Sequence, residues 1–316
     1  MKRRTFCGFS AALLGGGLPL AQQVRAETVK EADGPTGSIH PAYFIHGLPK
    51  AELHIHLEGL LEPADVLAMA AKRGLSYPYR TVDDVVARLA KITDLPTFIE
   101  VYESHARVLV DPEDFYDLAF RYFVRSQQQG VRRIEMHFDP QLHVPRGIPL
   151  GLIVQALDRA AKDARRQLNL SAGYIMAFNR NRSAESAMEL LKASEQFRGM
   201  ILGVGLDNPE EPGFPQKFAG VFRQARAMGY RLTSHCDVDQ PDSHTHLRDC
   251  IELLGVDRID HGVNIVDRPE LIALARSAGI GFTVCPNIFA APGGYYLEYF
   301  QTCARALRRM QAAGLP

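Results

Sequence analysis

The sequence has no excess of charge of either sign. Its 316 residues include 36 Lys plus Arg and 36 Asp plus Glu, so the formal net charge is zero with neutral histidine. A balanced chain gains no long-range attraction to polyanions. It also lacks a basic patch interleaved with aromatic residues, which nucleic-acid readers carry. We therefore expect a small neutral molecule as the partner and no nucleic acid.

Long hydrophobic runs are lacking as well. After residues 1–26, no stretch reaches the roughly 18 apolar residues of a membrane span, so none is expected. No GxGxxG motif follows the first predicted strand, which disfavours an open dinucleotide-binding sheet. With 46% hydrophobic residues, the chain can nevertheless bury a large core.

Cysteines are few and scattered. The sequence has 5, and Cys7 lies within residues 1–26. The others show neither CxxC spacing nor the framework of a small disulfide-rich domain: Cys236, Cys250, Cys285 and Cys303. Buried thiols are the simplest interpretation. A disulfide is the alternative in an oxidising compartment, and the spacing selects no pair.

The first 26 residues have the composition of an export signal. Arg3-Arg4 precedes an apolar stretch from Phe9 to Leu20, and the segment ends at Ala26, which suits signal cleavage. This pattern resembles a twin-arginine signal and predicts a soluble protein in the periplasm or outside the cell. A short amphipathic arm is the alternative. Residues 27–46 are rich in Glu, Gly and Pro and are predicted to be a linker to a folded domain, residues 47–316.

The folded domain alternates short apolar runs with longer helical patterns, which is typical of βαβ units and a parallel sheet. A helical insertion over roughly residues 81–129 is expected to add helices over the site. Seven strands in about 270 residues favour a TIM-like (β/α)8 barrel. The predicted strands are Ala51–Leu57, Arg133–Phe138, Ala172–Phe178, Ile201–Leu206, Arg231–Cys236, Arg258–His261 and Gly281–Cys285.

Histidines stand at the ends of three predicted strands, where such barrels place their active sites. The first strand ends with His54 and His56, and the i, i+2 spacing points both rings to one face. The fifth strand ends near His235 and the sixth at His261. A lone histidine is more often a packed core residue. Four at matching strand ends predict a metal site, because neutral imidazole is a common zinc ligand.

Several motifs carry a family resemblance. "LPKAELHIHLEG" from Leu48, "RIDHG" and "FTVCPN" occur in this order, and the chain resembles the adenosine and adenine deaminases of the amidohydrolase superfamily from Leu48 to its end. "DFYDLAFRYF", "FDPQLHVPRGIP" and Glu58 resemble the adenine deaminase branch. The resemblance implies a zinc hydrolase of purine metabolism that deaminates a 6-aminopurine and releases ammonia.

The resemblance also assigns residues to roles. It implies that His54, His56 and His235 bind one Zn²⁺, and that His261 orients or deprotonates the attacking water.

The resemblance implies substrate contacts for two further residues. Glu58 would lie at the pocket rim and contact the substrate, and in a base-specific enzyme it would take the space of a ribose. A solvated loop acid is the alternative. Asn208 lies in "GVGLDNPEEPGFP", which resembles the loop whose backbone contacts the purine; an ordinary turn is the alternative.

Two features depart from the family pattern. "HCDVDQ" places Val238 where the family has a glutamate that protonates a purine ring nitrogen. Asp237 and Asp239 are the candidates to replace it, unless they only cap the loop. A positioned general acid contributes roughly 10²- to 10⁴-fold. The family also continues past "AAGLP" into an eighth strand with an Asp pair, so a chain ending at Pro316 is expected to be truncated, with the eighth strand missing.

These departures leave three classes of function open. The first is deamination of adenine or adenosine. The second is a zinc amidohydrolase that acts on another amino-heterocycle, which "HCDVDQ" favours. The third is an inactive truncated remnant or periplasmic binding protein, which the expected loss of a strand favours.

Overall fold

The computed structural model describes residues 41–92, 94–236, 241–285 and 305–316. Contacts divide the chain into two units, Met1–Ile45 and His46–Pro316. Of the first unit only residues 41–45 are described, within helix α1 (Pro41–Gly47). The predicted export signal and most of the predicted linker therefore lie outside the described residues, and the fold below is that of the second unit.

The second unit is built on a parallel sheet whose strands follow one another in sequence order. All seven predicted strands form, and their bounds differ from the predicted ones by at most two residues. The strands are β1 (Lys50–His56), β2 (Val131–Phe138), β3 (Ser171–Asn179), β4 (Gly203–Asp207), β5 (Arg231–Cys236), β6 (Arg258–His261) and β7 (Gly281–Thr283). Every residue of β4 is buried, as expected for a strand covered on both faces.

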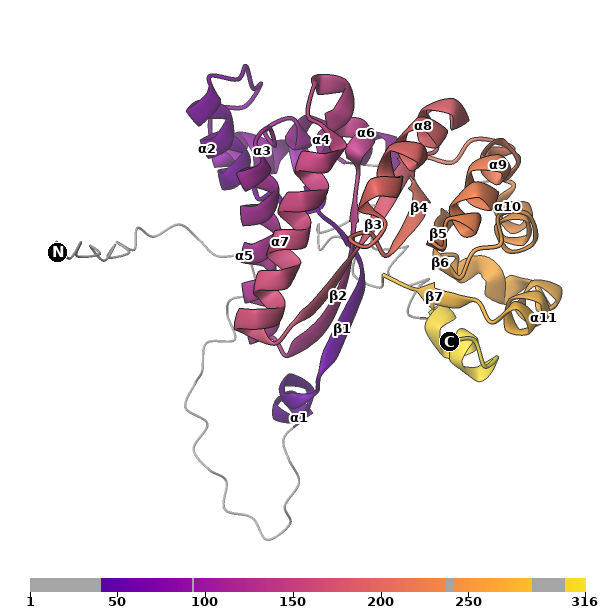
Figure 1. The fold of residues 1–316 in the computed structure, drawn as a ribbon. Coiled ribbons are helices and arrows are strands. Elements are labelled where there is room, and N and C mark those ends of the chain that lie inside the picture. Colours follow the sequence, from indigo (N-terminus) through magenta and orange to yellow (C-terminus); the bar gives the residue numbers. More distant parts are fainter. Residues whose placement is uncertain (1–40, 93, 237–240, 286–304) are drawn as a thin grey trace, which may run out of the picture. The chain divides into compact units, whose positions relative to one another are not determined.

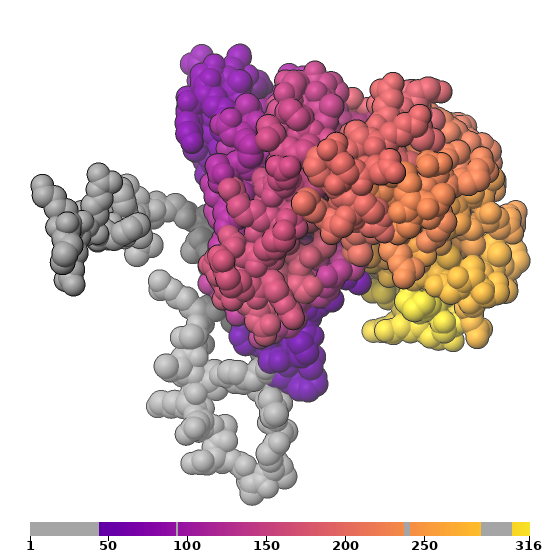
Figure 2. Space-filling model, in the orientation of Figure 1, coloured from indigo at the N-terminus to yellow at the C-terminus, as the bar shows by residue number. Residues whose placement is uncertain are grey.

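Helices connect the strands and lie outside the sheet (Figure 1). The α-helices are α2 (Pro63–Arg73), α3 (Val82–Leu89), α4 (Leu95–Ala106), α5 (Pro112–Gln128), α6 (Pro140–His143), α7 (Leu150–Leu168), α8 (Ala184–Ser194), α9 (Phe214–Ala227), α10 (Ser243–Asp249) and α11 (Pro269–Ala278). Short turns of 3₁₀ or π helix are η2 (Glu58–Leu60), η3 (Val144–Arg146), η4 (Glu195–Phe197), η5 (Cys250–Leu254) and η6 (Val263–Asp267). In the space-filling view of Figure 2, coloured by residue number, the surface of this unit follows the same order along the chain.

The predicted insertion does fold as helices. Residues 81–129 contain α3, α4 and α5, of which α5 packs against α7 and α4 packs against η2, directly after β1. Tyr102 on α4 therefore reaches the C-terminal end of β1, where Glu58 begins η2. The insertion thus contributes a side chain to the layer beneath the candidate site.

β1 and β7 form the two edges of the sheet. His54 Nδ1 lies 3.3 Å from Thr283 O and 3.3 Å from Thr283 Oγ1, so side chains link the two edges. Among the described residues no backbone ladder pairs β7 with β1, and the seam is open there. The prediction of a TIM-like barrel is confirmed, with seven strands in its described part.

The core has an apolar layer between sheet and helices and a charged interior. Fully buried rings such as Phe123 and Phe178 fill the outer layer. Inside the barrel, Arg258 donates to Glu135 at 2.7 Å and to Asp260 at 3.1 Å. Asp260 is fully buried and Arg258 and Glu135 are partly buried, and the pairing offsets the cost of removing these charges from water. This chain of charges leads from the barrel interior toward the candidate site.

Candidate metal centre

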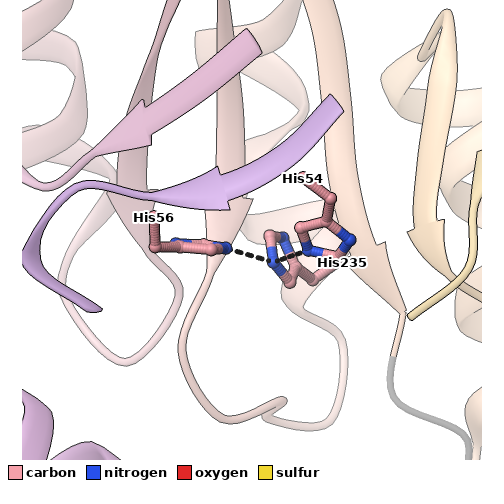
Figure 3. Close-up of side chains that lie close together, drawn as sticks. All are labelled: His54, His56 and His235. Atoms are coloured by element: carbon pink, nitrogen blue, oxygen red, sulfur yellow. Dashed lines mark hydrogen bonds between the residues drawn. The ribbon is translucent and has the colours of Figure 1, made fainter. Parts of the chain in front are cut away.

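Three imidazoles from two strands meet at the C-terminal mouth of the barrel (Figure 3). His54 Nε2 and His56 Nε2, both from β1, lie 2.8 and 3.1 Å from His235 Nε2 on β5. Nitrogens bound to one tetrahedral zinc at 2.0 to 2.1 Å are separated by roughly 3.3 Å. Three Nε2 atoms this close fit a shared metal ion. Without an ion, a hydrogen on one of the two rings would have to lie between each pair of nitrogens, because two lone pairs that face each other repel.

The other nitrogen of each ring faces a second partner. His235 Nδ1 lies 2.9 Å from Leu206 O, His54 Nδ1 3.3 Å from Thr283 O, and His56 Nδ1 3.8 Å from Asp207 Oδ2. The two shorter contacts fix the tautomers of His235 and His54 and turn their Nε2 atoms toward a shared ion, whereas the 3.8 Å contact of His56 is too long for a hydrogen bond. The Nε2 atoms of His54 and His56 both lie close to that of His235.

Burial keeps these rings neutral. It lowers the pKa of His54 to about 4, lowers the pKa of His56, and holds the pKa of His235 well below its ordinary value. Neighbouring histidines act in the same direction. Neutral imidazole is the form that binds metal, so the cluster is prepared for an ion at neutral pH.

His261 lies beside the cluster in a strained backbone conformation. Its ring centroid is 4.7 Å from that of His54, and its φ is 67°, which non-glycine residues rarely adopt. Burial and then His54 lower its pKa to about 3. Gly262 follows with φ 62°, and a Cβ there would lie 2.7 Å from Ile259 Cγ2. His261 and Gly262 therefore form a turn with two consecutive left-handed residues. This turn places the neutral imidazole of His261 at the C-terminal mouth of the barrel.

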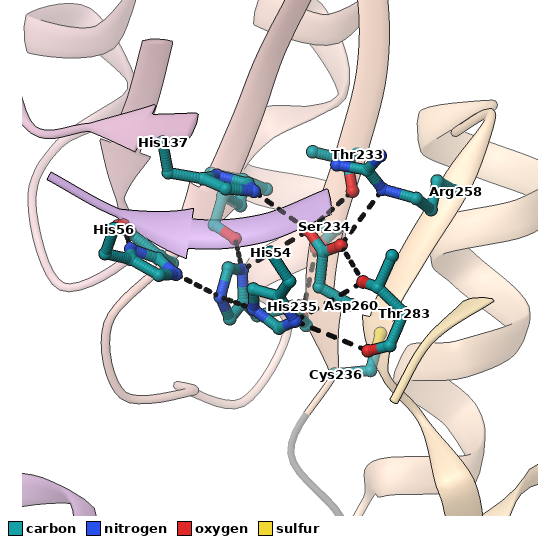
Figure 4. A network of polar contacts seen from close by, with 12 residues as sticks. His54, His56, His137, Thr233, Ser234, His235, Cys236, Arg258, Asp260 and Thr283 are labelled. Atoms are coloured by element: carbon teal, nitrogen blue, oxygen red, sulfur yellow. Dashed lines mark hydrogen bonds and ion pairs between the residues drawn. The ribbon is translucent and has the colours of Figure 1, made fainter. Parts of the chain in front are cut away.

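Asp260 and His137 are site residues that the sequence patterns did not single out (Figure 4). Asp260 Oδ2 accepts from Thr233 Oγ1 at 2.6 Å and lies 3.6 Å from His137 Nε2, and both Asp260 and His137 are fully buried. Burial alone would raise the pKa of Asp260, but His54, His137 and Arg258 outweigh it and lower that pKa. A signal existed, because Asp260 directly precedes His261 in "RIDHG".

Glu58 is not a solvated loop acid, and its contact with substrate stays a prediction. Only 1% of it is exposed, and its carboxylate accepts from Tyr102 Oη at 3.1 Å, the Asp139 amide at 3.1 Å and His143 Nε2 at 2.8 Å. Arg146 Nη2 donates to His143 Nδ1 at 2.7 Å, so the proton of His143 sits on Nε2. The Asp139 amide and His143 of the "FDPQLHVPRGIP" segment contact Glu58, which is why the alternative of a solvated loop acid is wrong.

Of the other predicted site residues, the structure describes Asn208 but not Asp237 or Asp239. Asn208 has φ 67° and is 6% exposed, so the segment makes a tight buried turn. Its contact with substrate stays a prediction. Asp237, Val238 and Asp239 lie outside the described residues, and the role predicted for the two acids stays a prediction.

Two of the described cysteines, Cys236 and Cys250, are free thiols. Cys236 and Cys250 are fully buried, with their Sγ atoms 3.6 Å apart, which agrees with the interpretation as buried thiols. Cys285 is partly exposed, and its Sγ lies 3.1 Å from His54 Nδ1.

The fold and site define a class of protein, a TIM-like barrel with a candidate metal centre at the C-terminal ends of its strands. The family model described as "Adenosine deaminase" matches residues 49–291. An uncharacterized deaminase of Schizosaccharomyces pombe is 44% identical over 252 residues, which cover 79% of this chain and 74% of the relative. The adenine deaminase of Geotalea uraniireducens is 40% identical over 250 residues, 78% of this chain and 70% of the relative. The chain belongs to the adenosine deaminase family.

Solved structures agree with this assignment. The adenine deaminase of Arthrobacter aurescens matches with a TM-score of 0.75 and 30% identity over 84% of this chain and 80% of that one. An amidohydrolase of Burkholderia ambifaria with bound zinc gives a TM-score of 0.75 and 30% identity over 89% and 78%.

Proposed function

We propose that this chain is a metal-dependent aminohydrolase that deaminates a 6-aminopurine with one zinc ion. The observation that carries the proposal is the meeting of His54, His56 and His235 through Nε2 at the barrel mouth, with His261 beside them. Relatives named adenine deaminase support the purine substrate.

Different residues are proposed for metal binding, for contact with the attacking water and for proton donation to the purine. His54, His56 and His235 would hold a zinc ion, which when bound lowers the pKa of water to about 7 and so supplies a nucleophile at neutral pH. His261 presents a neutral imidazole, because burial lowers its pKa to about 3, so it can accept a hydrogen bond from the attacking water and orient it. Asp237 or Asp239 donates a proton to the purine ring in place of the glutamate missing at Val238.

We propose a free base, adenine or a substituted 6-aminopurine, as the preferred substrate. The Asp139 amide and His143 Nε2 donate to the Glu58 carboxylate, and the single hydroxyl hydrogen of Tyr102 is shared between Glu58 at 3.1 Å and Asp139 at 2.5 Å. A carboxylate held in this way keeps acceptor capacity for a substrate and does not move aside for a ribose.

Ammonia release from the zinc-loaded full chain tests the proposal, with adenine, adenosine and other amino-heterocycles as substrates. We expect adenine to react faster than adenosine and a zinc chelator to abolish turnover. Faster release from adenosine than from every free base would overturn the base preference. A zinc-loaded protein that releases ammonia from none of them would overturn deamination and favour the binding-protein alternative.

For localisation, we propose export through the twin-arginine pathway, on the basis of Arg3-Arg4, the apolar stretch and Ala26. In the part of the chain that the structure describes, no helix is long and apolar enough to cross a membrane.

A further inference from the structure

Arg180 is a buried arginine directly after the end of β3. Only 1% of it is exposed. A buried guanidinium is tolerated only where its N–H groups find acceptors, so the acceptors reveal what the residue holds together.

The guanidinium of Arg180 joins the ends of two neighbouring strands. Nε donates to Asp207 O at 3.1 Å and Asn208 O at 2.9 Å, and Nη2 also donates to Asn208 O. Nη1 donates to His235 O at 2.5 Å. One side chain therefore fixes the backbone where β4 ends and the backbone of a proposed metal ligand on β5.

The same two strand ends orient the ligand rings. The backbone carbonyl of Leu206 on β4 faces His235 Nδ1 at 2.9 Å, and the Asp207 carboxylate faces His56 Nδ1 at 3.8 Å. Arg180 holds the peptide that follows Asp207 and also the carbonyl of His235 itself. Arg180 thus fixes the backbone of one proposed ligand, His235, and the end of β4 that carries Asp207, a neighbour of His56.

A counter-charge completes the arrangement. Glu210 Oε1 lies 3.2 Å from Arg180 Nη1, and Glu210 Oε2 lies 2.7 Å from His246 Nδ1. Glu210 is buried to the same extent as Arg180. Lysine could not replace this contact set, because an ammonium lacks the planar fork that reaches several carbonyls at once.

We infer that Arg180 is a positioning residue of the metal centre, which sets metal affinity by fixing the ends of β4 and β5. The inference rests on the proposed metal centre but not on the identity of the substrate. Partners of this outer kind typically change metal affinity by about 10- to 100-fold.

Arg198 offers a matched control, because it holds the opposite ends of the same strands. It donates to Ile201 O at 3.0 Å before β4 and to Met228 O at 2.9 Å before β5, and its guanidinium lies 4.3 Å from the Tyr230 ring. Arg180→Ala, Arg180→Lys and Arg198→Ala would be compared in the full chain by zinc competition with a chelator.

We expect Arg180→Ala to weaken zinc binding about 10- to 100-fold, and Arg180→Lys to fall between it and the wild type. Arg198→Ala should stay within about threefold of the wild type, since it touches no ligand or ligand partner. Millimolar guanidinium should strengthen zinc binding by Arg180→Ala, whereas urea at the same concentration should not. A purely structural arginine would give no such rescue.

Equal zinc affinity in folded Arg180→Ala and Arg198→Ala would overturn the inference. If Arg180→Ala does not fold, Arg180→Lys decides, and zinc binding as tight as in the wild type would overturn it. Zinc affinity is measured by competition with a chelator, so the measurement does not require catalytic activity. A wild type without deaminase activity would therefore overturn the proposed function alone, whereas an unchanged zinc affinity in the variants would overturn this inference alone.

Discussion

The carboxylate of Asp260 lies 3.7 Å from Nδ1 of His235, at the inner side of the metal centre. Arg258 holds the same carboxylate through Nε at 3.1 Å, and Thr283 donates to it from β7. Asp260 therefore ties β5, β6 and β7 together beneath the proposed ligands. Its negative charge also favours metal-bound over metal-free protein, because a cation at the mouth is attracted to it across a poorly solvated interior.

Asp260→Asn tests this relationship. The substitution keeps the size of the side chain but removes the charge, so Arg258 loses part of its pairing. We expect zinc affinity to fall about tenfold and the free energy of unfolding to fall by about 2 to 4 kcal/mol. Asp267→Asn is the control, because Asp267 is 54% exposed and pairs with Arg309 at the surface. A loss in Asp260→Asn no larger than in Asp267→Asn would contradict the assignment.

The ligand set is tested by single substitutions at His54, His56 and His235. Each alanine variant removes one of three donors, so we expect each to lose the bound metal at a zinc concentration that saturates the wild type. Metal content per protein measures the effect. His46→Ala is the control, because His46 is exposed. Full metal content in any of the three variants would remove that residue from the ligand set.

The sequence predicted that His54, His56 and His235 would meet at one mouth of the barrel, but it did not predict the groups that surround them. Period-2 alternation brings His54 and His56 to one face of β1, and strand order places His235 and His261 at the same mouth, so these positions follow from local pattern. The burial of Glu58 does not, because it depends on Asp139 and His143, which lie 81 and 85 residues away in the chain.

Contacts between residues that lie far apart in the sequence also explain why Arg180 was not predicted as part of the site. The role proposed for Arg180 depends on carbonyls that lie far away in the chain, those of Asp207 and Asn208 and that of His235, 55 residues away. The sequence motif around Arg180 contains no feature that predicts such a contact. Local periodicity specifies which way a side chain points from its strand, whereas the partner it meets depends on packing between strands and loops.

Acid should destabilise the metal-free protein. The folded pKa of His54 is about 4 and that of His261 about 3, both below the ordinary value of 6.5, so the unfolded chain binds more protons in this range. The stability that these rings contribute is complete above about pH 6.5 and is lost as pH falls toward 4. Each ring that stays neutral contributes a slope of up to about 1.4 kcal/mol per pH unit.

Urea unfolding of the chelator-treated protein at pH 7.5 and pH 5 measures this effect. His54→Gln should reduce the difference between the two pH values, since one titrating ring is gone, whereas His46→Ala should leave it unchanged. Equal midpoints at both pH values in the wild type would show that the rings are not buried as neutral groups.

Export is tested with a reporter that fluoresces only after folded transport. Residues 1–30 fused to the reporter should direct it to the periplasm, and the double substitution Arg3→Lys, Arg4→Lys should keep it in the cytoplasm, because the paired arginines are the feature that the pathway reads. Lys2→Arg is the matched control and should leave export intact. Unchanged export by the double variant would rule out this route.

Base preference is tested at Glu58, whose carboxylate contacts Tyr102 on α4 and the Asp139 amide and His143 of the segment after β2. Glu58→Asp shortens the side chain by one methylene, so it cannot reach both Tyr102 and His143, and it opens space beside the substrate. One methylene in a substrate pocket changes discrimination by about 10- to 200-fold. We expect the ratio of kcat/KM for adenosine to that for adenine to rise at least tenfold. Tyr102→Phe is the control, because it removes one donor and leaves the carboxylate fixed by the Asp139 amide and His143. A ratio in Glu58→Asp that matches the ratio in Tyr102→Phe would show that Glu58 supports the fold beneath the site without selecting the substrate.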